Sequence, residues 1–397
     1  MALSGLLAVL VFGQGIRRSF VLWILLAAVA AQILSWSLGV FSHPDWMADN
    51  PRIDRLAKLF IFIAVAWWLG GSTRNVLSLW LLAILGLLLA SVIQGDGIDE
   101  WLKGFSGERV GFGIRNGQHG AMLFGVVLLG MAVFTPRWLR PGPWRAFRCL
   151  AWSVLFVLSV IAVLIGQTRA IWLALLVVLP LVCGVFLYVS NVAKYRVITY
   201  RSVFLSLLGL SVVLLGAGLF LKEPLLERAT KESSVIGMLL QGKIDEVPYT
   251  SIGIRIHSWQ AAFEWIEQRP FVGWGGEARG LVMDHTPWLP DHVKEKYGHL
   301  HNYFLEVWVA YGLVGLLVVG ALAFWIGLAT WRSWRAGVLP GDMALFGFGF
   351  FVYWIIVNQF ESYNSFWTGV YVHNLVVGGL VTHYWRLQAG HNSQVPS

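Results

Sequence analysis

The chain of 397 residues is 57% hydrophobic and 13% charged, with a mean hydropathy of +0.67. Its charged fraction is about half that of an average soluble domain, which excludes an ordinary soluble globular protein. The net charge is +8. We expect membrane lipids as partners and no nucleic acid.

Uncharged runs of about 20 residues, the length that crosses a bilayer, recur along the whole chain. The clearest are residues 19–41, 75–93, 149–166, 170–193, 202–221, 307–331, 343–360 and 366–385. Residues 56–73 and 118–136 are weaker, because Lys58 and His119 lie near one end of each run. Residues 2–14 are apolar but short for a span. The predicted fold class is therefore an all-α multi-pass integral membrane protein with about 10–12 transmembrane helices.

Basic residues are distributed unevenly between alternate loops. One side of the membrane receives 13 Arg and Lys residues and a single acid, Asp342, whereas the other side receives 16 basic and 20 acidic residues. Cytoplasmic loops of membrane proteins carry an excess of Lys and Arg. The first side is therefore predicted to be cytoplasmic and to hold the C-terminus, and the second side to face outward.

The outward side holds one large loop of 79 residues, 222–300. Within it "HSWQAAFEWIEQ" has helical period, with Trp259, Ala262, Phe263 and Ile266 on one face. The stretch "RPFVGWGGEARG" follows as a Pro/Gly turn cluster. Three parts are predicted: N-terminal transmembrane helices at 1–221, a mostly helical outer loop domain at 222–300, and C-terminal transmembrane helices at 301–397.

Several cationic side chains on the outward side have no obvious structural need. Arg169 lies in the short turn "GQTRAIW", and an Arg at the bilayer edge is costly unless it is paired or faces a wet cavity. Arg255 opens the helix "RIHSWQAAFEWI", where a positive charge is slightly unfavourable for the helix dipole. Arg109, Arg115 and His119 lie in "ERVGFGIRNGQHGA". Snorkelling or solvation explains each of them singly; together they are candidates for binding a phosphorylated substrate.

Two histidines precede the apolar run at 307–331. In "KYGHLHNYFLEVWVAYGLVGLL", His299 and His301 come just before the apolar stretch that starts at Tyr303, and Glu306 lies one turn inside that stretch. His301 is a natural general base at neutral pH, because an unperturbed imidazole titrates near about 6.5. Asn302 could cap the helix, and either Glu306 or Glu361, from the turn "NQFESYNS", could orient the imidazole. The alternative is a hydrogen-bonded histidine in the belt at the membrane interface.

Motifs for metals and nucleotides are missing. The sequence has no DxD pair, no HExxH, no Walker loop and no dinucleotide fingerprint. We therefore expect no metal and no cofactor, and an activated substrate that arrives by way of the membrane. The predicted topology brings Arg169, Arg255, His301 and Glu361 to the outward face at similar depth, although they come from four regions of the sequence.

Three stretches in the second half of the chain resemble signatures of the bacterial O-antigen ligase and polymerase superfamily. They are "GQTRAIWLALLVVL", "RIHSWQAAFEWIEQRPFVGWGGE" and "HNYFLEVWVAYGLVGLL", in the family's order. The first half matches loosely through "RVGFGIRNGQHGAML". The start His-Asn-x-x-Leu-Glu, followed by Gly312 and Gly315, is the most specific piece. The overall pattern is most similar to the lipopolysaccharide O-antigen ligases.

The resemblance implies an activity and roles for named residues. It implies a glycosyltransferase of the bacterial inner membrane that moves O-antigen polysaccharide from undecaprenyl pyrophosphate to the lipid A–core on the periplasmic face. The transfer would be metal-independent and inverting. His301 matches the catalytic histidine, and Arg169 and Arg255 match arginines that would hold the pyrophosphate. The further candidates for substrate binding are Arg109, Arg115, His119, His299, Asn302, Glu306 and Glu361.

Alternatives of two kinds stay open. An O-antigen or exopolysaccharide polymerase, or a protein O-oligosaccharyltransferase, would share the donor and the signatures and differ in the acceptor. A polyprenyl-phosphate lipid transporter or flippase would use the outward arginines and histidine for binding alone, although such proteins usually have repeats and charges at mid-membrane. A structural scaffold does not explain the Arg and His clusters of the outer side.

Overall fold

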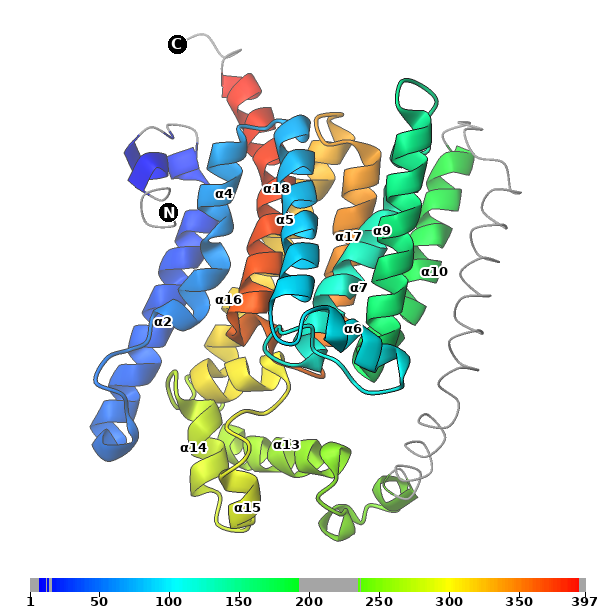
Figure 1. Ribbon diagram of the computed structural model, residues 1–397. Helices are drawn as coiled ribbons and strands as arrows, with labels where there is room; N and C mark the ends of the chain where they lie inside the picture. The colour runs from blue at the N-terminus through cyan, green and yellow to red at the C-terminus, as the bar shows by residue number, and fades with distance from the viewer. Residues whose placement is uncertain (1–6, 12, 14–15, 193–234, 236, 393–397) are drawn as a thin grey trace. The chain divides into compact units, whose positions relative to one another are not determined.

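The computed structural model describes residues 7–192 and 235–392, except 12, 14, 15 and 236. These residues form helices joined by loops, and no strand occurs among them (Figure 1). Five of the described helices are long and apolar enough to cross a membrane: α2 (Phe20–Ser42), α5 (Thr73–Ile93), α9 (Arg145–Ile165), α10 (Arg169–Val192) and α16 (Tyr303–Arg335). The all-α multi-pass fold class is confirmed. The predicted span 202–221 lies outside the described residues.

The chain divides into two compact units. The first unit is Met1–Leu89 with His257–Ser397, and the second is Ala90–Ile256. Beside α2 and α16, the first unit contains α3 (Asp54–Ala57), η3 (Lys58–Phe60), α4 (Phe62–Leu69), α14 (Ala278–His285), α15 (Asp291–Lys294), α17 (Gly341–Val357), η5 (Tyr363–Ser365) and α18 (Trp367–Asn392). The helices α5 and α13 (Ser251–Gln268) each continue from one unit into the other. These units are defined by packing and not by the sides of a membrane. The predicted division into 1–221, 222–300 and 301–397 therefore stays a prediction.

In the first unit, α16 packs against α2 and α18, and α18 also packs against α4 and α17 (Figure 1). Near the start of α16, Glu306 accepts a hydrogen bond from Ser365 of η5, the turn that leads into α18. Further along, Trp325 of α16 lies against Tyr384 of α18. The two helices therefore run in the same direction. Each has a basic residue near its C-terminal end: Arg335 is the last residue of α16, and Arg386 lies six residues before the end of α18.

The segment before α5 is broken into α3, η3 and α4, and side chains of α18 satisfy the break. Asn374 accepts a hydrogen bond from the backbone N of Phe62 (2.6 Å) and donates to the carbonyl of Lys58 (2.9 Å). Thr382 donates to the carbonyl of Ala66 (2.7 Å). Backbone groups in an apolar environment require such partners. These contacts fix the position of Lys58 close to the start of α16.

Helix α16 is interrupted at Gly312, whose φ of 61° and ψ of −160° are not helical. The turn 270–275, part of the sequence "RPFVGWGGE", lies in the interruption and supplies the missing partners. The bonds are Leu313 N to Pro270 O (2.8 Å), Val314 N to Phe271 O (3.1 Å), Trp274 N to Val309 O (2.9 Å) and Gly275 N to Ala310 O (2.8 Å). A Cβ atom at Gly312 would overlap the backbone of Phe271. Glycine is therefore required here by both φ and space.

Gly312→Ala is expected to destabilise the protein by at least about 2 kcal/mol, because it adds a left-handed alanine to a steric overlap. The measurement is thermal unfolding of the purified protein in detergent. Gly327→Ala is the matched control, since Gly327 lies in the same helix with open space around its Cβ position. The control should be neutral or slightly stabilising. Equal melting temperatures for both variants would show that the interruption is not rigid.

The second unit is built around α7 (Gly117–Val133), which packs against α9 and α10. Its other short helices are α6 (Ile98–Phe105), α8 (Thr135–Trp138) and η4 (Ile244–Glu246). Glu100 of α6 accepts hydrogen bonds from the backbone of Gly111, Phe112 and Gly113. Asn116 caps α7 by accepting from two backbone N–H groups. Together they hold the loop that carries Arg109 and Arg115.

Candidate functional site

Three segments of the first unit meet where α16 begins. The backbone N of Tyr303 donates to the carbonyl of Asn358, at the end of α17 (2.9 Å). Asn302 caps α16 by accepting from the backbone of Phe304 (3.0 Å) and Leu305 (3.2 Å), as the sequence indicates. Trp259 of α13 donates to the carbonyl of Leu300 (2.8 Å). The loop 299–302 is thereby held between α13 and the turn that follows α17.

The two predicted histidines of this loop contact the same carboxylate, that of Glu361. Nδ1 of His301 lies 3.0 Å from Oε2 of Glu361, and Nε2 of His299 lies 3.2 Å from Oε1. The Glu361 side chain is only 2% exposed, whereas those of His299 and His301 are 24% and 12% exposed. Glu361 also accepts from the backbone N of Ser362 (3.0 Å). The carboxylate is therefore buried beneath two partly accessible imidazoles.

Glu361 is ionised in this setting. Burial raises the pKa of a carboxyl group, but hydrogen bonds from His299 and His301 and attraction to both rings outweigh it, so the pKa of Glu361 is held below its ordinary value. An ionised carboxylate only accepts hydrogen bonds, so Nδ1 of His301 and Nε2 of His299 donate. In the neutral His301 ring the lone pair is then on Nε2.

The backbone of His301 has a positive φ of 52°. Few residues other than glycine adopt this region, and they are enriched at functional sites, where the surrounding structure holds them in place. Here the cap of α16 follows directly and Leu300 is anchored on both sides, by Trp259 and by Glu306. The left-handed residue turns the chain into α16 and brings the His301 ring to Glu361.

Glu306 is buried in the first turn of α16. Its carboxylate accepts from Ser362 Oγ (2.6 Å), Ser365 Oγ (2.8 Å) and the backbone N of Leu300 (3.2 Å), and it lies 3.4 Å from Arg279. Glu306 thus ties the turn that carries Glu361 to the loop that carries His301. Of the two acids that could orient the base, the structure places Glu361 against His301.

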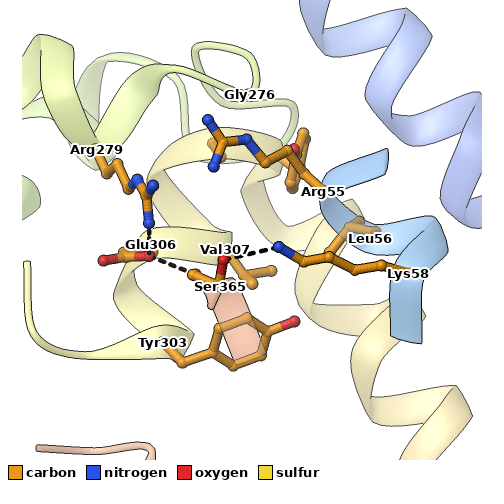
Figure 2. A pocket seen from close by; sticks show the side chains of 11 residues that line it. Arg55, Leu56, Lys58, Gly276, Arg279, Tyr303, Glu306, Val307 and Ser365 are labelled. Atoms are coloured by element: carbon orange, nitrogen blue, oxygen red, sulfur yellow. Dashed lines mark hydrogen bonds and ion pairs between the residues drawn. The ribbon is translucent and has the colours of Figure 1, made fainter. Parts of the chain in front are cut away.

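A small pocket is lined in part by Glu306. Its wall contains three cationic side chains and one carboxylate: Arg55 of α3, Lys58 of η3, Arg279 of α14 and Glu306 of α16. Figure 2 shows Arg279 and Lys58 reaching the pocket from opposite sides, Arg279 toward Glu306 and Lys58 toward Ser365. Lys58 Nζ donates to the carbonyl of Ser365 (2.8 Å). Such an excess of positive charge suits an anionic ligand.

The pocket cations were not predicted from the sequence as site residues. Lys58 gave a signal, because it interrupts an otherwise apolar run, and Arg279 belongs to the turn cluster "RPFVGWGGEARG". Arg55 is partly neutralised by Glu277, at 3.2 Å, and Glu277 also pairs with Arg52 at 2.7 Å. Glu277 does not line the pocket, so part of the charge of Arg55 is balanced outside the pocket. Lys58 and Arg279 instead contact groups of the pocket wall, Ser365 and Glu306.

The remaining predicted residues belong to the second unit. Arg169 is the exposed first residue of α10, and Arg255 is half-buried in the first turns of α13. Arg109 donates to the carbonyl of Gly166 and the hydroxyl of Thr168, both at 3.4 Å, in the turn that precedes Arg169. His119 is buried in α7, and Arg115 lies in the preceding loop with a φ of 39°. Within this unit Arg109 and Arg169 are thus brought to one turn.

The sequence predicts no metal-ligand motif, but the fold assembles a candidate ligand set in the first unit. His299, His301 and Glu361 each offer an atom, and these atoms lie within 4.8 Å of one another. Sequence motifs cannot detect this set, because Glu361 is 60 residues from His301.

The sequence is similar to a known protein family and to one curated protein. Residues 154–320 match the protein-family model described as O-Antigen ligase. An uncharacterized protein of Haemophilus influenzae is 24% identical over 176 residues. That alignment covers 42% of this chain and 39% of the relative, so the chain spans about two fifths of the length of the curated relative it matches. The matched range 154–320 includes Arg169, Arg255, His301 and Glu306.

Proposed function

We propose that the chain, whose residues 154–320 match the family model described as O-Antigen ligase, transfers O-antigen polysaccharide from undecaprenyl pyrophosphate to a sugar hydroxyl of the lipid A–core. The observation that carries the proposal is the pairing of His301 with buried Glu361 close to a cationic pocket. A base and an anion site are the two parts that transfer from a diphosphate-linked sugar requires. The acceptor must lose a proton, and the leaving pyrophosphate must be stabilised.

His301 is the proposed general base. Glu361 holds the His301 ring through Nδ1, so Nε2 can take the proton of the acceptor hydroxyl. The acceptor oxygen then bonds to the anomeric carbon as the bond from that carbon to the pyrophosphate oxygen breaks. Attack opposite the leaving group inverts the anomeric configuration. Glu361 stabilises the imidazolium that forms and does not itself take the proton.

Cations stabilise the leaving undecaprenyl pyrophosphate in this scheme. The family resemblance assigns that role to Arg169 and Arg255 of the second unit. Within the first unit, Lys58 and Arg279 of the pocket are the candidates for the same role. Arginine suits the role because its planar donor fork matches phosphate oxygens and stays charged. With charge held in this way the reaction needs no metal. Within the first unit, Asn302 would hold the loop that carries His301 by capping α16.

An outward, periplasmic site in the bacterial inner membrane is part of the proposal. It is supported by the basic residues Arg335 and Arg386, which lie near the C-terminal ends of α16 and α18, whereas His301 and Glu361 precede the starts of these helices. The positive-inside rule assigns the basic end to the cytoplasm. The polysaccharide would then lie outside, and the lipid tail along the helices within the bilayer.

The test is transfer by the purified protein in detergent, with lipid-linked O-antigen and lipid A–core as the only substrates. We expect core-linked polysaccharide to form in EDTA and without nucleotide. Elongation of the lipid-linked glycan in the absence of core would instead indicate a polymerase. Lipid translocation in proteoliposomes without any glycan transfer would indicate a transporter. In a deletion strain, a ligase defect leaves polymerised lipid-linked glycan and bare core, whereas a polymerase defect leaves core with one unit.

A further inference from the structure

The cluster His299–His301–Glu361 contains more ligand atoms than a catalytic His–Glu pair requires. The rings of His299 and His301 have centroids 3.9 Å apart and are tilted by 50°. One ring nitrogen of each histidine and one oxygen of Glu361 lie within 4.8 Å of one another. The general base needs only His301 and Glu361, so the position of His299 on the second carboxylate oxygen has no part in the proposed transfer.

Two imidazoles and one carboxylate are a ligand set for Zn²⁺ that leaves a position open for water. Imidazole also suits Co²⁺ and Ni²⁺, whereas Mg²⁺ and Ca²⁺ prefer oxygen ligands. Metal–ligand bonds of about 2.0 Å place tetrahedral ligand atoms about 3.3 Å apart. The separations of 3.0 Å and 3.2 Å between the imidazole nitrogens and Glu361 are close to that spacing. These two distances go to different oxygens of Glu361, so the side chains must move closer together for one metal to bind all three.

We propose that His299, His301 and Glu361 form a binding site for a transition-metal cation of the Zn²⁺ class, and that its occupation inhibits the enzyme. The inhibition rests on the proposed function of His301 as the base. A metal bound at Nδ1 of His301 uses the lone pair of that nitrogen, so the proton of the neutral ring moves to Nε2. The ring then has no lone pair for the proton of the acceptor hydroxyl. Metal and acceptor proton thus compete for one imidazole.

Metal binding is tested without any substrate. The purified full-length protein is titrated with Co²⁺, whose visible absorption reports tetrahedral coordination, and with Zn²⁺ by calorimetry. We expect one site per chain and displacement of Co²⁺ by Zn²⁺. His299→Ala and Glu361→Gln should each weaken binding by roughly 10–100-fold or more. His299→Asn provides a second, smaller change, and the elution profile of each variant in size-exclusion chromatography reports folding.

The matched control is His292→Ala, because His292 is an exposed histidine on α15 of the same unit. This variant should bind Co²⁺ as the unchanged protein does. Co²⁺ binding that survives in both His299→Ala and Glu361→Gln would overturn the proposed metal site. Loss of Co²⁺ binding in His292→Ala would overturn it as well. So would the absence of a visible Co²⁺ band.

The inhibition is measured as the Zn²⁺ concentration that halves transfer, relative to the metal-free rate of each variant. We expect transfer to fall in Zn²⁺, to recover in EDTA, and to require more Zn²⁺ in His299→Ala. Metal binding without inhibition would overturn the competition for His301 and leave the binding site standing. A protein that binds Co²⁺ as expected but never transfers glycan would instead contradict the proposed function.

Discussion

Replacement of His301 by glutamine is expected to reduce glycan transfer by at least about 100-fold, the lower end of what a positioned general base contributes. Glutamine keeps a polar side chain of similar reach but cannot accept the proton of the acceptor hydroxyl. The rate is measured with purified protein at saturating donor and acceptor, in EDTA so that metal has no effect. Donor binding should change little, because the pocket cations and Glu306 are unaltered.

Two variants separate catalysis from folding in this experiment. His292→Gln makes the same chemical change at an exposed histidine of α15 and should retain full activity. Glu361→Gln keeps the shape of the carboxylate but removes its charge, so it should lower the rate while leaving donor binding intact. Undiminished transfer in His301→Gln, with a normal elution profile, would remove His301 from the role of base.

Partners close in sequence could be predicted, and partners distant in sequence could not. Asn302 directly precedes the first residue of α16, and a side-chain oxygen in that position caps a helix by local geometry alone. The choice between Glu306 and Glu361 as the partner of His301 depends instead on how the turn after α17 folds back. Ser362 and Ser365 of that turn bind Glu306, which leaves Glu361 for the histidines.

Breaks inside apolar segments were equally hard to predict. Hydropathy indicates one continuous run at 56–73, but the structure has η3 ending at Phe60 and α4 beginning at Phe62. The partner that satisfies this break is Asn374, more than 300 residues away in sequence. The interruption at Gly312 likewise depends on the turn 270–275. Periodicity describes a helix alone, whereas these features require a second segment to supply hydrogen bonds.

Removal of the pocket cations is expected to produce the second large loss of activity. Arg279→Gln and Lys58→Gln each take away a positive charge that faces the pocket, and preorganised donors of this kind contribute about 3–4 kcal/mol to charge stabilisation. We therefore expect kcat to fall by at least about 100-fold in each variant. Donor binding should weaken as well, since the pyrophosphate carries charge before the reaction and gains more during it.

Charge is separated from structure by conservative replacements and a matched control. Arg279→Lys and Lys58→Arg keep the charge and should recover part of the activity, though not all, because the two side chains differ in donor geometry. Lys296→Gln removes a charge from an exposed position of the same unit and should have no effect on kcat. Transfer and donor affinity are measured together by rate assays and by binding of lipid-linked glycan. If Arg279→Gln and Lys58→Gln bind and transfer like Lys296→Gln, the pocket holds no pyrophosphate and its cations serve only to fix Glu306 and Ser365.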